Sequence, residues 1–158
     1  MRIGLGKLIE RRKGFRAADG GASAVEFAMV APFLCALLLG MIDVGQALWY
    51  KSQVTNAVQA GAQYAILKGF NAAAIQNAIT GATGLTSIQA SPAPTQSCGC
   101  PNATTGVVAA ACSATCSDGS TPATYVTVSA QASYTWLVPY AGSSNPATLS
   151  SKSIVRIK

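Results

Sequence analysis

The feature that most constrains this chain is an uncharged apolar run, from Phe27 to Ile42, that follows a basic N-terminal segment. Extended back to Ala24, across the single charged residue Glu26, the stretch has 19 residues. A helix of that length measures about 28 Å, close to the roughly 30 Å of hydrocarbon in a bilayer. A secretory signal would carry its small residues after the apolar core, whereas here they precede it. The run therefore predicts a membrane-spanning helix.

The charge distribution predicts how that helix is oriented. Only 10% of the 158 residues are charged, against roughly 25% in soluble domains. The first 21 residues hold six bases and two acids; the bases are Arg2, Lys7, Arg11, Arg12, Lys13 and Arg16. A basic chain can indicate nucleic-acid binding, but bases gathered beside an apolar helix mark a cytoplasmic end. We expect a membrane protein with its N-terminus in the cytoplasm, its C-terminal domain on the opposite side of the membrane, and no nucleic-acid partner.

The residues that open the apolar run contain an unexpected acid. Residues 20–32 read GGASAVEFAMVAP, with Glu26 where a spanning segment usually carries Lys or Arg. A glycine followed by a small residue, with Glu at the fifth position, resembles the processing site of type IV pilin-like proteins. The longer string Gly-x-Ser-Ala-Val-Glu-Phe-Ala-x-Val-x-Pro, continued by GMIDVG at residues 40–45, is similar to the TadE group, the pseudopilin-like proteins of tight-adherence (Flp) pili.

This resemblance implies a function, a location and a set of partners. The location is the inner membrane, with a single pass and the C-terminal domain in the periplasm, or, after assembly, the extracellular pilus. A prepilin peptidase would cut after Gly21, so that Ala22 becomes the new N-terminus and Glu26 the fifth mature residue. Glu26 would pair with the α-amino group of a neighbouring subunit, and Phe27 would add apolar packing surface. The expected function is that of a minor pilin in pilus biogenesis, with the peptidase, other pilin or pseudopilin subunits, the inner-membrane assembly platform and the lipid bilayer as partners. The alternative is an unprocessed bitopic membrane protein whose periplasmic domain scaffolds a secretion machine or binds a partner.

Beyond the membrane, the periodicity predicts two more helical segments. From Trp49 to Lys68, small and apolar residues recur at helical spacing and form one narrow face: Val54, Ala57, Val58, Gly61, Ala62, Ala65 and Ile66. That face could pack inside the protein's own domain, and it is also compatible with packing in a pilus core. Gly69 should end this helix, and Asn71 can cap a shorter one through about Thr80.

The rest of the chain predicts a small β domain. Residues 90–118 are rich in Ser, Thr, Pro, Gly and Ala, which indicates loops and short strands. Alternation from Tyr125 to Trp136 predicts a half-buried strand, and Ile154–Ile157 predicts a short partner. The fold class is therefore α+β: a long N-terminal helix, a short helix and a small antiparallel sheet with disulfide-linked loops. The expected segments are a cleaved leader (1–21), a transmembrane helix (22–48), an amphipathic and a second helix (49–80), and a β-rich domain (81–158).

Four of the five cysteines fall in the predicted periplasmic domain: Cys98, Cys100, Cys112 and Cys116. An oxidising compartment favours two disulfides over an all-cysteine zinc site. Four cysteines allow three pairings, and the sequence does not choose between them. A nested arrangement, Cys98 to Cys116 and Cys100 to Cys112, would suit the two arms of a hairpin. Cys35, in the middle of the apolar run, is expected to be an inert packed thiol.

The residues offer no arrangement typical of catalysis. The chain has no histidine, and its acids beyond residue 21 are Glu26, Asp43 and Asp118, far apart in the sequence. An acid near the end of a membrane helix can be an ion or proton site. For Asp43 we favour a structural or interfacial role, because it lies near the outer interface and its surroundings match the Gly-x-Ile-Asp/Glu-x-Gly pattern of the TadE group. We expect neither enzymatic activity nor a metal or cofactor.

Overall fold

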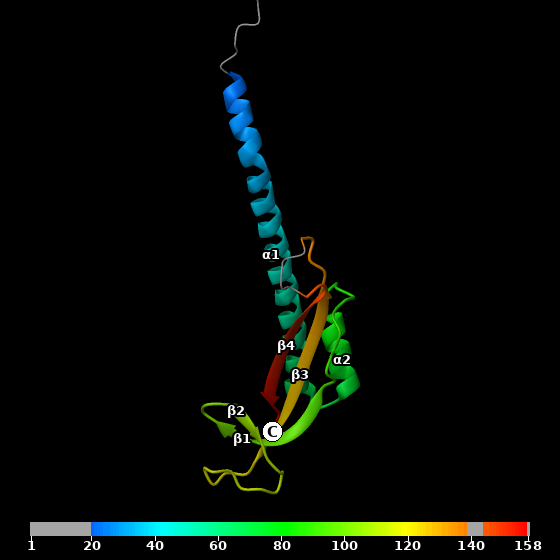
Figure 1. Cartoon of the computed structure of the whole chain (residues 1–158). Coiled ribbons are helices and arrows are strands. Elements are labelled where there is room, and N and C mark those ends of the chain that lie inside the picture. Colours follow the sequence, from blue (N-terminus) through cyan, green and yellow to red (C-terminus); the bar gives the residue numbers. More distant parts are fainter. Residues whose placement is uncertain (1–19, 139–143, 158) are drawn as a thin grey trace, which may run out of the picture. The chain divides into compact units, whose positions relative to one another are not determined.

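The computed structural model describes residues 20–138 and 144–157 of the chain. It divides into two compact units, residues 1–41 and residues 42–158. Figure 1 shows the order of elements: helix α1, helix α2 and then strands β1 to β4. The basic residues of the expected leader, from Arg2 to Arg16, lie outside the described residues.

Helix α1 runs from Gly20 to Lys68 and contributes to both units. It ends where predicted, because Gly69 takes a positive φ of 82° that other residues rarely adopt. The Gly69 amide still donates to the Ala65 carbonyl, at 3.0 Å. By length and composition, α1 is the one helix among the described residues that could cross a membrane, and none of its most apolar stretch is buried within the protein.

Helix α2 runs from Ala72 to Gly81 and confirms the predicted second helix. Asn71 has an extended backbone and is its N-cap. Its Oδ1 accepts a hydrogen bond from the Ala74 amide at 3.0 Å, which satisfies one of the amides that the first helical turn leaves without a partner. Ile75 and Ile79 form the buried face of α2.

The sheet has four antiparallel strands in the order β2-β1-β3-β4. Strand β1 is Thr95–Asn102, β2 is Gly106–Ala109, β3 is Ala123–Tyr134 and β4 is Ala147–Arg156. Strand β4 is longer than predicted. Its polar first half contains few apolar residues, but it pairs with β3 from Tyr134↔Ala147 to Tyr125↔Arg156, and backbone pairing extends a strand whatever the polarity of its outward side chains.

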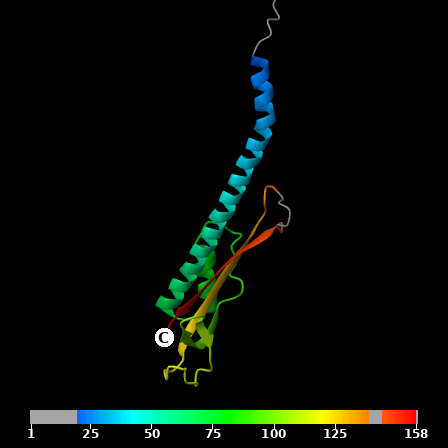
Figure 2. The ribbon, with the colours of Figure 1, turned by 60° about the vertical axis from the view of Figure 1, so that its left-hand side comes forward.

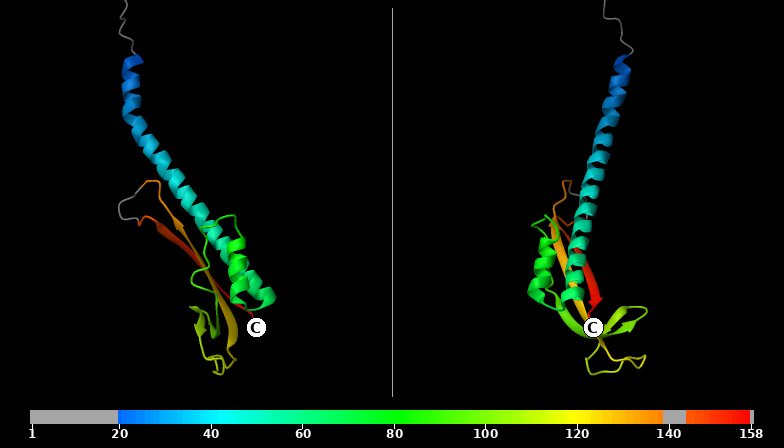
Figure 3. Two further views of the ribbon diagram at one scale, coloured as in Figure 1. Left: turned by 90° about the vertical axis from the view of Figure 1, so that its right-hand side faces the viewer. Right: turned by 180° about the vertical axis from the view of Figure 1, so that it is seen from behind.

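The core of the second unit lies between the sheet and the two helices. Figures 2 and 3 show α2 and the C-terminal part of α1 on the same side of β3 and β4. The alternation predicted for β3 is confirmed, with every second side chain buried: Val126, Val128, Ala130, Ala132 and Tyr134. Val126, Val128, Ala130 and Ala132 form one buried cluster with the small face of α1 and the buried face of α2. The small face of α1 is therefore an inner face of the protein's own domain.

Gly61, on α1, shows how close this packing is. A Cβ atom added to Gly61 would lie 2.6 Å from Ile79 Cγ1 and 3.0 Å from Val128 Cγ1, so only glycine lets helix, helix and sheet meet there. Ile66 was expected on the same face, and that prediction is wrong, since its side chain is 53% exposed. The buried face ends at Ala65, three residues before the end of the helix at Lys68.

Candidate functional site

The predicted processing segment lies at the start of α1. Gly21 and Ala22 belong to the first turn of the helix, and Glu26 follows one turn later. The side chains of Glu26 and Phe27 are exposed, Phe27 to 69%. Cys35, further along the helix, is also exposed, so the expectation of a packed thiol is wrong within this chain. An exposed acid followed by exposed apolar side chains is a surface that no described residue of the protein covers.

Asp43 is different, because the fold encloses it completely. Its side chain is 0% exposed. The Tyr134 hydroxyl, from the end of β3, donates to Asp43 Oδ1 at 2.7 Å and lies 3.0 Å from the Asp43 carbonyl oxygen. Two backbone amides complete the shell: Leu137 N lies 3.3 Å from Oδ1, and Val138 N lies 3.1 Å from Oδ2. A buried carboxylate is costly without such donors, and both oxygens here have one.

The carboxylate of Asp43 therefore joins α1 to the end of β3. Side chains around the junction form a series of aromatic contacts. The ring centroids lie 5.2 Å apart for Trp49 and Tyr50, 5.4 Å for Tyr50 and Tyr134, and 5.1 Å for Tyr134 and Trp136. Edge-to-face pairs at these distances are favourable. The arrangement holds a strand end against a helix, which is the structural role expected for Asp43.

The four periplasm-assigned cysteines form two disulfides, but not the nested pair. The bonds join Cys98 to Cys112 and Cys100 to Cys116, with Cα–Cα distances of 5.1 and 5.6 Å. The sheet register explains the pairing. Strand β2 continues beside β1 so that the Ala110 amide donates to the Cys98 carbonyl, which brings Cys112 close to Cys98. The chain then turns back, with the Ala114 amide on the Ala111 carbonyl, and returns Cys116 towards Cys100.

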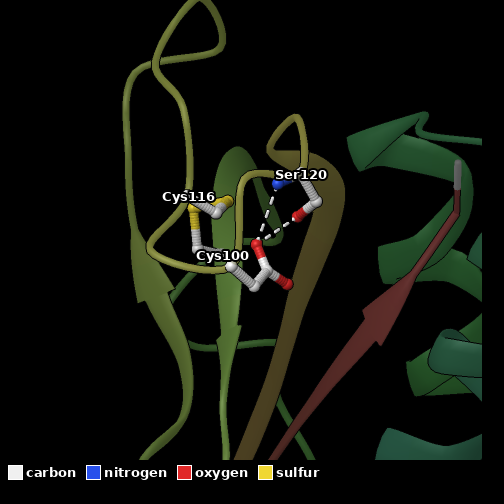
Figure 4. The surroundings of a disulfide bond; sticks show 4 residues. Cys100, Cys116 and Ser120 are labelled. Atoms are coloured by element: carbon white, nitrogen blue, oxygen red, sulfur yellow. Dashed lines mark hydrogen bonds between the residues drawn. A yellow bond between two sulfur atoms is a disulfide. The ribbon is translucent and has the colours of Figure 1, made fainter.

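The loop after Cys116 is closed by its own hydrogen bonds, shown in Figure 4 beside the Cys100–Cys116 disulfide. Asp118 Oδ1 accepts from the Ser120 hydroxyl at 2.7 Å and from the Ser120 amide at 3.0 Å. These donors, the hydroxyl first and then the amide, hold the pKa of Asp118 below its ordinary value of 3.8. In the described ranges, no group of three or more acidic or cysteine side chains could hold a metal ion.

Comparison with known proteins finds a match for the N-terminal part of the chain. The family model described as "TadE-like protein" matches residues 21–63. The match agrees with the resemblance drawn from the sequence, and the family implies a pilin-like component associated with Tad pili. No curated protein and no solved structure matches the chain.

The TadE-like segment includes both Glu26 and Asp43, but the structure gives these acids different surroundings. Glu26 is exposed, whereas Asp43 is buried under the end of β3. Sequence reasoning did not identify Tyr134, Leu137 or Val138 as partners of Asp43. One signal was present, because an acid beside an apolar run needs hydrogen-bond donors. Since the chain has no histidine, those donors had to come from other side chains or from the backbone.

Proposed function

We propose that the chain is a minor pilin or pseudopilin of the tight-adherence (Flp) pilus, held in the inner membrane by α1 and processed by a prepilin peptidase after Gly21. The observation that carries the proposal is the TadE-like match, which begins at residue 21 and takes in Glu26. The exposed apolar surface of the first part of α1 supports it, because such a surface is stable only in lipid or against other apolar helices. We propose no catalytic role.

Glu26 has the central part in assembly. A carboxylate in a bilayer costs about 2.5–3.5 kcal/mol even by insertion scales, and an ammonium partner in low dielectric offsets that cost. Cleavage after Gly21 would create such a group at Ala22. Pairing of Glu26 with the α-amino group of a neighbouring subunit would then make assembly depend on processing. Phe27, exposed to 69%, would add apolar contact beside the ion pair.

Two adjacent glycines allow a sharp test of processing. Gly21→Leu should block cleavage, because the peptidase must accept the backbone just before Ala22. Gly20→Leu is the matched control, since its spacing to Glu26 is one residue too long, and it should still be cleaved. Intact mass after co-expression with the peptidase distinguishes the products. A mature chain beginning at Ala22 supports the proposal. A retained leader in the unmodified protein would instead favour the unprocessed bitopic anchor.

Two further measurements test the remaining parts of the proposal. A reporter active only in the periplasm, fused after Lys158, should be active if the basic leader stays in the cytoplasm; activity of a cytoplasmic reporter there would reverse the topology. Glu26→Gln should be processed normally yet recovered less in sheared pili than the unmodified chain. Equal recovery of both proteins would remove the assembly role of Glu26.

A further inference from the structure

We propose that the segment from Tyr134, the last residue of β3, to Val138 is a membrane-contacting tip that rests in the outer interface of the bilayer beside α1. The inference rests on the proposed membrane anchoring, and it goes further by assigning a lipid surface as partner to part of the C-terminal domain. Within this tip, three apolar residues follow one another: Trp136, Leu137 and Val138.

The depth of the tip follows from its hydrogen bonds. Both oxygens of Asp43 accept backbone amides of the tip, from Leu137 and Val138. Asp43 follows directly on Ile42, the last residue of the uncharged apolar run. A segment bonded to Asp43 therefore lies level with the end of that uncharged run, in the outer part of the predicted spanning helix.

The exposed surface of α1 next to Asp43 is also suited to lipid. Past Ile42, the side chains that remain exposed include Val44 at 48%, Leu48 at 66% and Trp49 at 51%. The next charged residue after Asp43 is Lys51. An apolar surface that ends in Trp and then Lys is typical of the point where a helix passes from lipid into the headgroup region. The tip thus borders a part of α1 that itself faces the interface.

The tip has the chemistry of an interfacial segment. Leu137 is 63% exposed, although its own amide is held by Asp43. Trp136 and Tyr134 continue the aromatic series from Trp49 and Tyr50, and Trp and Tyr are enriched at membrane–water interfaces. The donors of the tip point to Asp43 while Leu137 is exposed. The tip consequently shields a carboxylate that would be costly at this depth and presents an apolar side chain in its place.

The two tryptophans of the chain make the proposal testable in the full-length protein. The Trp49→Phe variant leaves Trp136 as the single tryptophan, which is excited selectively at wavelengths that tyrosine does not absorb. The protein is reconstituted in vesicles of phosphatidylethanolamine and phosphatidylglycerol that contain phosphatidylcholine brominated either near the headgroup or near the middle of the acyl chains. Trp136 should be quenched more by the shallow bromines than by the deep ones, and iodide in the water should quench it weakly.

Two matched variants in a background without native tryptophan calibrate the result. Val108→Trp, on the half-exposed outer strand β2, should be quenched by iodide and not by the lipids. Phe33→Trp, within the spanning run, should be quenched by the deep bromines. If Phe33→Trp is quenched and Trp136 behaves like Val108→Trp, the tip inference is wrong while the anchoring stands. If Phe33→Trp is not quenched by lipid, both the anchoring and the inference are wrong.

A substitution at the apolar side chain separates lipid contact from mere proximity. Leu137→Asp leaves the backbone amide bonds to Asp43 in place. Because the Leu137 side chain is exposed, the substitution should not impair folding. It should abolish the shallow-lipid quenching of Trp136. Ile154→Asp, at a side chain 43% exposed on β4, is the control and should leave that quenching unchanged. Unchanged quenching in Leu137→Asp, or an equal loss in Ile154→Asp, would overturn the proposal.

Discussion

Removal of a single hydroxyl tests how the end of β3 is held to α1. In Tyr134→Phe, Asp43 Oδ1 loses the shortest of its hydrogen bonds, the one of 2.7 Å, while both backbone amides remain. A hydrogen bond to a charged group contributes about 1.5–3 kcal/mol. The free energy of unfolding should fall by that amount, which raises the unfolding equilibrium constant roughly 10- to 150-fold.

The assay is guanidinium unfolding of the full chain in detergent micelles, followed by tryptophan fluorescence. Trp136 is a local reporter, since its ring lies 5.1 Å from that of Tyr134. Tyr125→Phe is the matched control. Tyr125 is a buried tyrosine of the same strand, 8% exposed, and its hydroxyl makes no side-chain hydrogen bond to the residues that the structure describes. Its loss should change the free energy of unfolding by less than about 0.5 kcal/mol.

A double-mutant cycle assigns the effect to the pair. In the Asp43→Ala background, Tyr134→Phe should cost less than in the unmodified chain, because the carboxylate that the hydroxyl serves is gone. Equal costs in both backgrounds, or a Tyr134→Phe cost no larger than that of Tyr125→Phe, would show that the hydrogen bond does not hold the strand end.

Three further changes probe the rest of the domain. Gly61→Leu should destabilise the protein by about 1 to 3 kcal/mol through overpacking against α2 and β3, and an unchanged thermal midpoint would contradict the close packing. Replacing Cys98 and Cys112 together by serine should cost about 3 kcal/mol, as expected for a loop of this length; equal stability with and without reductant would contradict that. The ionised carboxylate of Asp118 stabilises the loop fully when the pH is above the ordinary pKa of an Asp side chain. This stabilisation is lost as the pH falls through the lowered pKa that Asp118 has in the folded protein. Asp118→Asn should therefore be less stable than the unmodified protein at pH 6 and no different at the acid end of the titration, and a constant difference at all pH values would remove the role of the Ser120 donors.

The parts of the fold that follow local rules could be predicted from the sequence. The end of α1 depends on one glycine, the start of α2 on one asparagine cap, and the position of β3 on strict alternation. Each of these signals is contained in a few adjacent residues. The early end of the buried face, which leaves Ile66 exposed, could not be foreseen because it depends on where the sheet stops covering the helix.

The remaining contacts depend on how distant segments come together. Tyr134 and Asp43 are separated by 91 positions, and no periodicity in either segment indicates that they meet. The disulfide pairing likewise depends on the register of β1 and β2 and on the turn that follows Ala110. The extent of β4 depends on its partner strand, since its own residues are mostly polar.

The two outer strands of the sheet determine which surfaces of the protein can associate. Strand β4 is an edge, but the Lys51 ammonium of α1 donates to its Ser150 carbonyl, and Lys152 lies on the same strand. Lysines on an edge strand oppose addition of a further strand. Strand β2, at the other edge, has only four residues. Both edges of the sheet are therefore poor templates for a further strand, which opposes aggregation of the domain through intermolecular β structure.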